Sequence, residues 1–366
     1  MKPNVLIASS RGLRDYRAPL RALKKLKYST KAAILLLAVL LFIALLGDAL
    51  EVEHSSATNN RLPSREETIC SVRFKSNRMA LCFFLAYGGN FGDELGPAAV
   101  DLVLKDRFHC TSNVLKLDVA QPKIDRQRRQ QGIKCLFTLG SIFHSIQHGD
   151  HVWGTGVNPY WQEKYSYATG VQVYSVRGPK TEKLLRKNLG IQHSIPHGDP
   201  GFLVPLMDSE FATGTRAPGG DRFCFVPHFH DVEQARKSLP DGILSVSAAQ
   251  PWRPVVKILA QECDYVASSS LHGIVVADAL GIPSMWFQFH NTTTSITEGR
   301  FKYLDYLEAV GRNDIKVPVA DTNQLRNKNA YTSILDIKNR KSIVNRTISS
   351  FPFHLFESKI VELVST

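Results

Sequence analysis

The stretch at residues 263–287 constrains the fold of this chain most strongly. It reads CDYVASSSLHGIVVADALGIPSMWF. A short apolar run at 264–267 is followed by serines at 268–270, a segment apolar on one face at 271–280, and a second apolar run at 282–287. This order predicts strand, turn, helix and strand, a parallel βαβ unit. A ligand is expected where the strand ends and the helix begins, because free backbone N–H groups and the helix dipole favour an anion there.

His272 lies on the first helical turn of this unit, beside the hydroxyls of Ser269 and Ser270. An imidazole in that place can hold a phosphate oxygen or move a proton near neutral pH. The alternative is that His272 only caps the helix and packs. The S-S-S-L-H-G pattern resembles the signature of the polysaccharide pyruvyl transferase family, which carries S-x-L-H-G at the start of a helix in its C-terminal domain.

A second candidate region follows an apolar strand predicted over residues 79–87. It reads GGNFGDELGP at 88–97 and leads into a helix predicted over 98–108. Asp93 would repel a phosphate beside this turn, so we expect it to face a sugar hydroxyl as base or hydrogen-bond acceptor. Its alternative role is to cap the helix. The segment is similar to the family's G-N-x-G-D element, which implies that Asn90 and Gly92 also bind substrate.

Arg177 follows a strand predicted over residues 172–176 and precedes a helix that opens with Gly178 and Pro179. An arginine there can grip a carboxylate or phosphate with two N–H groups, the alternative being a surface salt bridge. The V-R-G-P pattern resembles the family's motif. Segments at 140–144, 152–156 and 198–201 resemble further family elements. His228, at the end of a strand predicted over 222–227, and Lys302, in a segment of the F-K-F-x-D-Y type, are candidate cations of the cleft.

The resemblance covers about residues 79–310, with five or six motifs in the family's order. It implies an α/β fold with two Rossmann-like domains facing a cleft, the arrangement called GT-B. It also implies transfer of a pyruvyl group from phosphoenolpyruvate to two hydroxyls of a hexose, often galactose, giving a pyruvate ketal and phosphate. His272 would be the acid, Arg177 the donor clamp and Asp93 the acceptor-side base. No cofactor or metal is expected.

One residue departs from the pattern of many family members. They place Arg immediately before L-H-G, where this chain has Ser270. A branch that resembles bacterial exopolysaccharide enzymes also has Ser there. We expect His228, Arg300 or Lys302 to supply the missing positive charge.

The net charge of +12 is concentrated at the N-terminus. Residues 1–31 hold nine Lys or Arg and one Asp, which leaves only about +4 for the rest and argues against nucleic-acid binding. Residues 32–47 are uncharged and apolar. They predict a single-pass signal anchor in the membrane of the Golgi or of another secretory compartment, with the later residues in its lumen. A signal peptide cleaved near Ala49 is the alternative.

The resemblance and the apolar N-terminal run together imply an α/β chain with two Rossmann-like domains behind one transmembrane helix. The expected parts are a basic cytosolic tail at 1–31, a transmembrane anchor at 32–49, a stem at 50–78, an N-terminal domain at 79–205, a linker at 206–221, a C-terminal domain at 222–330 and a closing helix at 331–366.

The cysteines and sequons bear on the same topology. Of the six cysteines, Cys82, Cys135 and Cys224 lie in apolar runs, where a free buried thiol is the ordinary interpretation. One or two disulfides are possible in an oxidising lumen, and spacing does not choose the pairing. No metal-binding spacing occurs. Asn291 and Asn345 begin N-x-T sequons, which are glycosylation acceptors if the chain is lumenal.

Two other functions remain open from the sequence. The first is a sugar-nucleotide-dependent glycosyltransferase of GT-B fold, which would need a base-stacking pocket and a ribose-binding acid. The second is a lectin-like protein that binds glycans without turnover.

Overall fold

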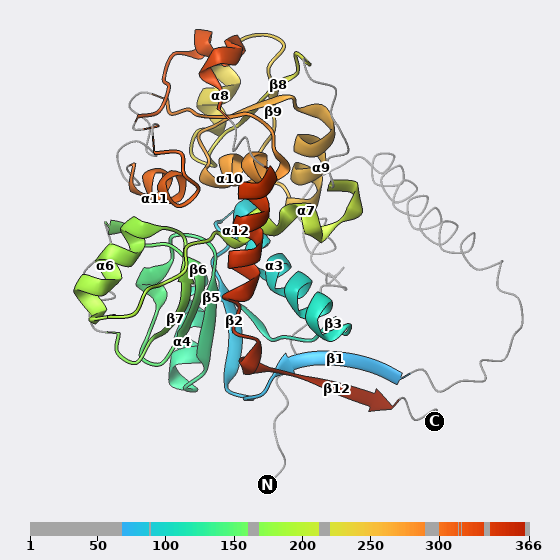
Figure 1. The fold of residues 1–366 in the computed structure, drawn as a ribbon, viewed down its shortest axis with the longest axis vertical. Helices are drawn as coiled ribbons and strands as arrows, with labels where there is room; N and C mark the ends of the chain where they lie inside the picture. Colours follow the sequence, from blue (N-terminus) through green and yellow to red (C-terminus); the bar gives the residue numbers. More distant parts are fainter. Residues whose placement is uncertain are drawn as a thin grey trace, which may run out of the picture. The chain divides into compact units, whose positions relative to one another are not determined.

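Figure 1 shows the computed structural model of the chain. It describes residues 68–362 except 88, 160–167, 212–219, 290–299, 314, 316 and 333–336. The chain divides into two compact units, Met1–Glu66 and Glu67–Thr366, and all described residues belong to the second. The tail and anchor expected at 1–49, most of the stem and the sequon residue Asn291 therefore lie outside the described residues.

A five-stranded parallel sheet forms the first layer of this unit, in the order β4-β2-β5-β6-β7. Its strands are β2 (Met79–Phe83), β4 (Lys116–Asp118), β5 (Lys134–Thr138), β6 (His151–Thr155) and β7 (Gln172–Val176). Helices α3 (Phe91–Phe108) and α4 (Pro122–Gln130) lie between them in sequence, and α6 (Pro179–Leu189) follows β7. Strand β2 is the first strand of this sheet in sequence. The next strand, β4, pairs with one edge of β2, and β5 pairs with the other edge. The direction of winding therefore reverses between β2 and β5, and doubly wound sheets bind ligands at the carboxyl ends of strands at such a reversal.

A four-stranded parallel sheet repeats this arrangement in the order β11-β10-β8-β9. It consists of β8 (Phe223–Val226), β9 (Leu244–Ser245), β10 (Tyr265–Ser268) and β11 (Ser284–Trp286), connected through α8 (Val232–Ser238), α9 (Trp252–Glu262) and α10 (Leu271–Leu280). Winding reverses between β8 and β10. The predicted strand, turn, helix and strand are confirmed as β10, the serine turn, α10 and β11, and all residues of α10 are buried.

The chain closes on a third, small sheet. Strand β1 (Thr68–Phe74) pairs antiparallel with β12 (Phe356–Glu362) and parallel with β3 (Thr111–Ser112). Part of the expected stem is thus a strand, because β12 pairs with it from the other end of the chain. The Arg73 side chain of β1 donates a hydrogen bond to the Glu357 side chain of β12, which is 284 positions away. Within the segment expected as a closing helix, α12 (Ile337–Ser349) is helical, and the buried Trp153 indole of β6 donates a hydrogen bond to its Thr347 carbonyl over 3.1 Å.

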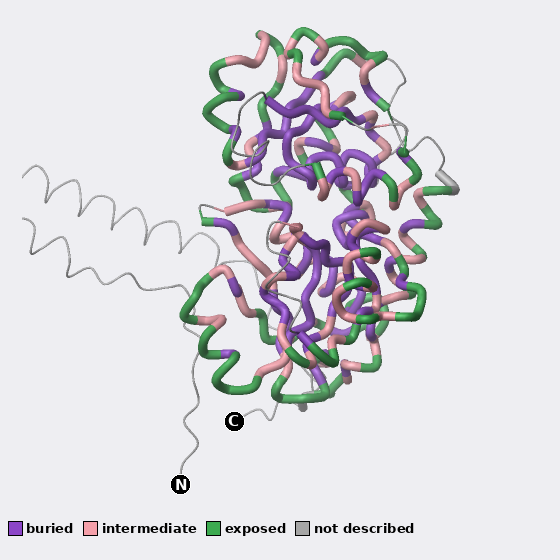
Figure 2. Tube along the Cα trace, turned by 90° about the vertical axis from the view of Figure 1, so that its left-hand side faces the viewer, coloured by how far each residue is buried: buried purple, intermediate pink, exposed green. Residues whose placement is uncertain are grey.

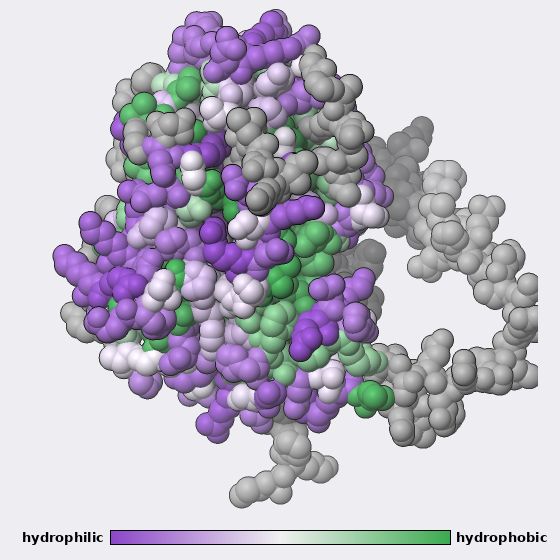
Figure 3. All heavy atoms as spheres, viewed as in Figure 1, coloured by the Kyte–Doolittle hydropathy of each residue, from purple (hydrophilic) through white to green (hydrophobic). Residues whose placement is uncertain are grey.

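Shorter elements connect these layers. They are η1 (Phe143–Ser145), η3 (Pro200–Leu203), α7 (Val204–Met207), η4 (Ser209–Phe211), α11 (Phe301–Ala309), η6 (Thr322–Arg326), η7 (Lys328–Ala330) and η8 (Phe353–Leu355). Figure 2 shows buried residues running through both parallel sheets, with exposed residues on the outer helices and loops. Figure 3 shows hydrophilic residues over much of the face seen in Figure 1. The strand residues are apolar because both faces of a parallel sheet are covered.

The structure corrects the expected fold class. The described residues form a mixed α/β fold with small parallel sheets, and none of their helices has the length and apolar character needed to cross a membrane. Helix α3 has 18 residues, but it carries acidic side chains in its first turn and basic side chains in its last turn. The described residues thus give no support to the expected transmembrane helix, whose residues 32–49 lie outside them.

The cysteine interpretation was wrong. All six cysteines are paired, as Cys70–Cys110, Cys82–Cys135 and Cys224–Cys263. The apolar surroundings of Cys82 and Cys135 suggested free thiols, but β2 and β5 are neighbours in the sheet and bring the two Cα atoms to 5.4 Å. Such a separation suits a disulfide. Only the order of strands in the sheet reveals this proximity.

Candidate active site

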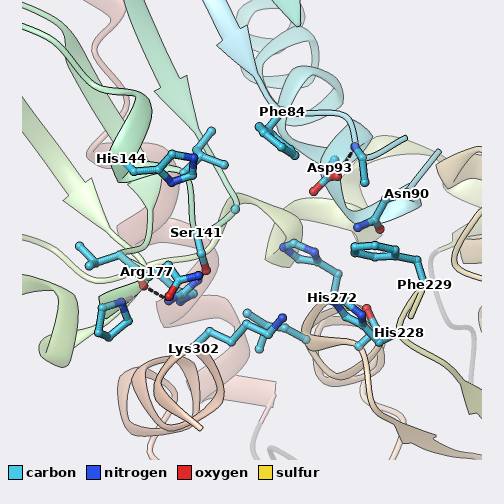
Figure 4. A pocket seen from close by; sticks show the side chains of 18 residues that line it. Phe84, Asn90, Asp93, Ser141, His144, Arg177, His228, Phe229, His272 and Lys302 are labelled. Carbon is cyan, nitrogen blue, oxygen red and sulfur yellow. Dashed lines mark hydrogen bonds between the residues drawn. The ribbon is translucent and has the colours of Figure 1, made fainter. Parts of the chain in front are cut away.

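A pocket of about 190 Å³ lies where the two winding reversals face each other. Figure 4 shows it from close by. Most of the lining follows the carboxyl ends of strands, namely β2 and β5 at the reversal of the first sheet, β8 and β10 at the reversal of the second, and also β6 and β7. Lys302 comes from α11. The lining residues are Phe84, Ala86, Asn90, Asp93, Gly140, Ser141, Ile142, His144, Val157, Asn158, Pro159, Arg177, His228, Phe229, Ser270, Leu271, His272 and Lys302. The topology thus predicts a single ligand site shared by both sheets.

Arg177 lines one end of the pocket from the end of β7, as predicted. Its side chain is fully buried, and Nε donates to Asp305 Oδ2 over 3.1 Å while Nη1 donates to Ser141 Oγ over 2.7 Å. A Cβ on Gly156 would overlap the guanidinium, so only glycine leaves room for the Arg177 side chain. The salt bridge proposed as the alternative role exists, but it is buried and it holds the guanidinium at the pocket wall.

Lys302 reaches the same pocket from α11, as Figure 4 shows. Burial lowers the pKa of its ammonium group to about 7, and the nearby positive charge of Arg177 adds to the effect, while the negative charges of Asp93 and Asp231 oppose it. Two basic side chains therefore face one small cavity. Such a cavity gains stability when an anion enters.

Asp93 lies toward the other end of the pocket, on the first turn of α3. Asn90 caps this helix, because its Oδ1 accepts the Gly92 N–H over 3.0 Å, so Asp93 is not the cap. Asp93 Oδ2 accepts the Ala86 N–H over 3.1 Å. Burial raises the pKa of this carboxyl to about 7, although the Ala86 hydrogen bond and Lys302 lower it. A carboxyl with a pKa near 7 can take or give a proton at neutral pH.

Two aromatic side chains accompany Asp93 and Asn90. In Figure 4, Phe84 lies beside Asp93 and Phe229 beside Asn90, away from Arg177 and Lys302. The pocket therefore has an anion-binding end with two basic groups and a second end with carboxyl, amide and aromatic groups. The second end has the composition of a sugar site, where hydroxyls meet polar atoms and ring faces meet apolar ones.

His272 lies between the two ends, on the first turn of α10. Its side chain is 9% exposed, and Nε2 is 4.0 Å from Asp199 Oδ2. Burial lowers the pKa of the imidazole to about 3, with further lowering by the positive charges of Lys302 and Arg177. A Cβ on Gly92 would overlap Nδ1 of this ring. Gly92, which we expected to bind substrate, thus makes room for His272.

The serine turn and His228 have partly different roles from those expected. Ser270 is the N-cap residue of α10, although its side chain makes no capping hydrogen bond, and it lines the pocket. Ser269 does not line the pocket. Ser269 Oγ accepts the His228 N–H over 2.9 Å, and its carbonyl accepts the Tyr303 hydroxyl over 2.6 Å. His228 lines the pocket, but burial lowers its pKa to about 2, so it is neutral near pH 7. Arg300 is exposed and does not line the pocket.

Sequence reasoning missed three polar residues of the site. Ser141 hydrogen bonds to Arg177, Asp305 pairs with it, and Asp199 faces His272. Ser141 and Asp199 fall in segments that resembled family elements, so their position was the available signal. Asp305 accepts the Thr181 N–H over 2.9 Å, a contact across 124 positions that no local pattern reveals.

The sequon residue Asn345 is exposed on α12. Within the described ranges, no group of three or more His, Cys, Asp or Glu could hold a metal ion.

Comparison with known proteins agrees with the motifs. An uncharacterized protein of Acanthamoeba polyphaga mimivirus, L143, is 29% identical over 178 residues, which is 47% of this chain and 59% of that protein. No solved structure shows a significant match. Residues 131–291, which contain Arg177, Asp199 and His272, match the family model described as polysaccharide pyruvyl transferase. That segment is thereby identified with the polysaccharide pyruvyl transferase family, and the match supports a transferase enzyme.

Proposed function

We propose that this protein transfers the pyruvyl group of phosphoenolpyruvate to two hydroxyls of a terminal hexose on a glycan, galactose being the first acceptor to test. The observation that supports this most is the division of one pocket into a basic end, with Arg177 and Lys302, and a carboxyl-bearing end, with Asp93. An anionic donor fits the first end and a hydroxyl acceptor the second. His272 lies between them.

The chemistry needs one proton donor, one proton acceptor and a grip on the donor anion. Protonation of donor C3 makes C2 electrophilic, and a sugar oxygen then forms a C–O bond to C2. The C2–O bond to phosphate breaks, and a second sugar hydroxyl forms the other C–O bond of the ketal. Of the two hydroxyl protons, one balances the new C–H bond and the other leaves with phosphate. General acid–base groups contribute about 10²–10⁴-fold to such steps.

Each role suits the chemistry of a residue in the pocket. Burial and the two cations hold the pKa of His272 at about 3, so His272 takes up the proton that it gives to C3 only when the anionic donor brings negative charge beside it. Asp93, with a pKa near 7, takes a proton from a sugar hydroxyl. Arg177 is preorganised by Asp305 to donate N–H groups to the donor anion. Lys302 supplies the cation that many family members carry at the place of Ser270, since His228 is neutral and Arg300 lies outside the pocket lining.

The compartment is proposed from the disulfides. All six cysteines are paired, and structural disulfides persist in oxidising environments such as the secretory pathway. We therefore infer that the protein folds in an oxidising compartment.

The test incubates the protein with phosphoenolpyruvate and a β-galactoside, and in parallel with sugar nucleotides. Phosphate release, with the acceptor gaining one pyruvate less one water, supports the proposal. Addition of a hexose would support the glycosyltransferase instead, and binding without turnover a lectin-like role. Lys302→Ala should raise the donor KM, whereas His272→Ala should lower kcat by about 10²–10⁴-fold. Full activity of His272→Ala would remove that residue from the mechanism.

The arginine requires a different substitution. Arg177→Ala would leave Asp305 buried without its cation, which destabilises a protein by about 3–5 kcal/mol. Arg177→Lys keeps a positive charge but loses the two-pronged geometry. We expect Arg177→Lys to fold and to lose donor affinity, and an unchanged donor KM would argue against the clamp.

A further inference from the structure

Asp199 and His272 present two buried polar atoms to each other. Asp199 is 2% exposed and precedes η3, where its Oδ1 accepts the Gly201 N–H over 2.9 Å. Its Oδ2 has no hydrogen-bond partner among the described residues, and neither has His272 Nε2. The two atoms are 4.0 Å apart. Buried polar atoms without partners are uncommon and destabilising, so two of them that face each other indicate a functional interaction between these side chains.

The imidazole is oriented so that its two nitrogens have different neighbours. Nε2 faces Asp199, while Nδ1 faces the first turn of α3, close to Gly92. That turn also carries Asp93 at the pocket. A carboxylate beside one ring nitrogen fixes the proton on that nitrogen and stabilises the imidazolium when the other nitrogen takes a proton.

We propose that Asp199 is the positioning residue of His272. When the anionic donor enters, a shift of about 1 Å brings Oδ2 within hydrogen-bond distance of Nε2–H. The hydrogen bond then fixes the ring, leaves Nδ1 as the nitrogen that gives and takes the proton, and stabilises the imidazolium. This inference rests on the proposed role of His272 as the acid.

The surrounding charges explain why His272 needs a carboxylate partner. Lys302 of α11, Arg177 after β7 and His228 after β8 all face His272 and lower its pKa. Arg177 and Asp305 face Asp199, and Tyr306 of α11 lies near it. Burial raises the pKa of Asp199 to about 6, so its carboxylate is ionised above that pH. An ionised Asp199 and the anionic donor together offset the two cations that oppose an imidazolium.

The competing explanation is that Asp199 only caps η3. The cap uses Oδ1, and an asparagine would preserve it, because the amide oxygen accepts the Gly201 N–H equally well. The amide nitrogen would then face Nε2 and favour the opposite tautomer. Asp199→Asn therefore separates the two explanations.

The kinetic test measures Asp199→Asn, His272→Ala and the double variant with phosphoenolpyruvate and acceptor. We expect Asp199→Asn to keep its thermal unfolding temperature and donor KM but to lose kcat by about 100-fold, within the range of general acid catalysis. The double variant should be no slower than His272→Ala, because residues that act as a unit are not additive. A double variant slower by the full product of both losses would overturn the positioning role.

A second measurement does not depend on turnover or on Asp199→Asn. The full chain is labelled with ¹⁵N-histidine, and the His272 signals are assigned as those absent from His272→Gln. At pH 8 we expect the Nε2–H tautomer, since Asp199 is then ionised. The Nδ1–H tautomer would contradict the proposal. If the Nε2–H tautomer is found but no donor is consumed, the pairing stands and the proposed function fails.

Discussion

At the scale of single residues, two pKa shifts predict how activity depends on pH. Asp93 must be ionised to accept a proton, so kcat/KM should fall about tenfold per pH unit below its pKa of about 7. Lys302 must be charged to bind the donor, so kcat/KM should fall above its pKa of about 7. Together these two groups therefore contribute a narrow bell centred near pH 7 to the pH dependence of kcat/KM.

The substitution Lys302→Arg separates the two limbs of this bell. Arginine stays charged at all accessible pH values, so the alkaline limb should disappear while the acid limb remains. The measurement is kcat/KM for phosphoenolpyruvate between pH 5 and pH 9. An alkaline limb that persists in Lys302→Arg would assign it to another group.

Residue identity at the pocket was predictable where a motif stood at the end of a strand. His272, Asp93 and Arg177 were chosen because each follows a predicted strand, and Lys302 was chosen because its segment resembles a family element. All four line the pocket. Ser269 and Gly92 were chosen with their neighbours, but the Ser269 hydroxyl accepts the His228 N–H and Gly92 makes room for the His272 ring. These contacts join segments far apart in sequence, so local pattern could not assign them.

At the scale of elements, the contact between the first turns of α3 and α10 should control His272. Gly92→Ala places a methyl group where Nδ1 now lies. Alanine stabilises a helix by about 1 kcal/mol relative to glycine. We therefore expect any loss of thermal stability in Gly92→Ala to come from displacement of the His272 ring. Because the ring must move, kcat should fall by about 100-fold or more.

Gly132→Ala is the control for this variant. A Cβ at Gly132 meets nothing within 4 Å, and the residue follows α4, outside the pocket lining. Its positive φ of 64° makes alanine destabilising by about 1 kcal/mol, without an effect on kcat. Equal kcat in Gly92→Ala and the natural protein would show that His272 does not need this space.

The disulfide between β2 and β5 joins two strands whose carboxyl ends form one wall of the pocket. Replacing Cys82 and Cys135 with alanine should lower the free energy of unfolding by about 2–5 kcal/mol, since the bridge restricts the unfolded chain. Denaturant unfolding with and without a reducing agent measures this. If reduction left the stability of the natural protein unchanged, the bridge would not form in solution.

At the scale of the whole molecule, the sequence predicted the βαβ units but not how the chain closes. Alternation of apolar runs with turns located β2, β5, β8 and β10. Strand β1 was taken for stem because its partner β12 lies at the opposite end of the chain. The pairing of Cys82 with Cys135 and of Arg177 with Asp305 also depends on long-range order, which one-dimensional patterns do not carry.

The proposed reaction joins an anionic three-carbon donor to a sugar diol between two facing sheets. The most direct test is to run the reaction in D₂O and analyse the glycan product by mass spectrometry and NMR. We expect a ketal whose methyl group carries at least one deuterium, formed in equal amount to the phosphate released. A product without deuterium in a new methyl group, or phosphate release that needs no acceptor, would contradict the mechanism.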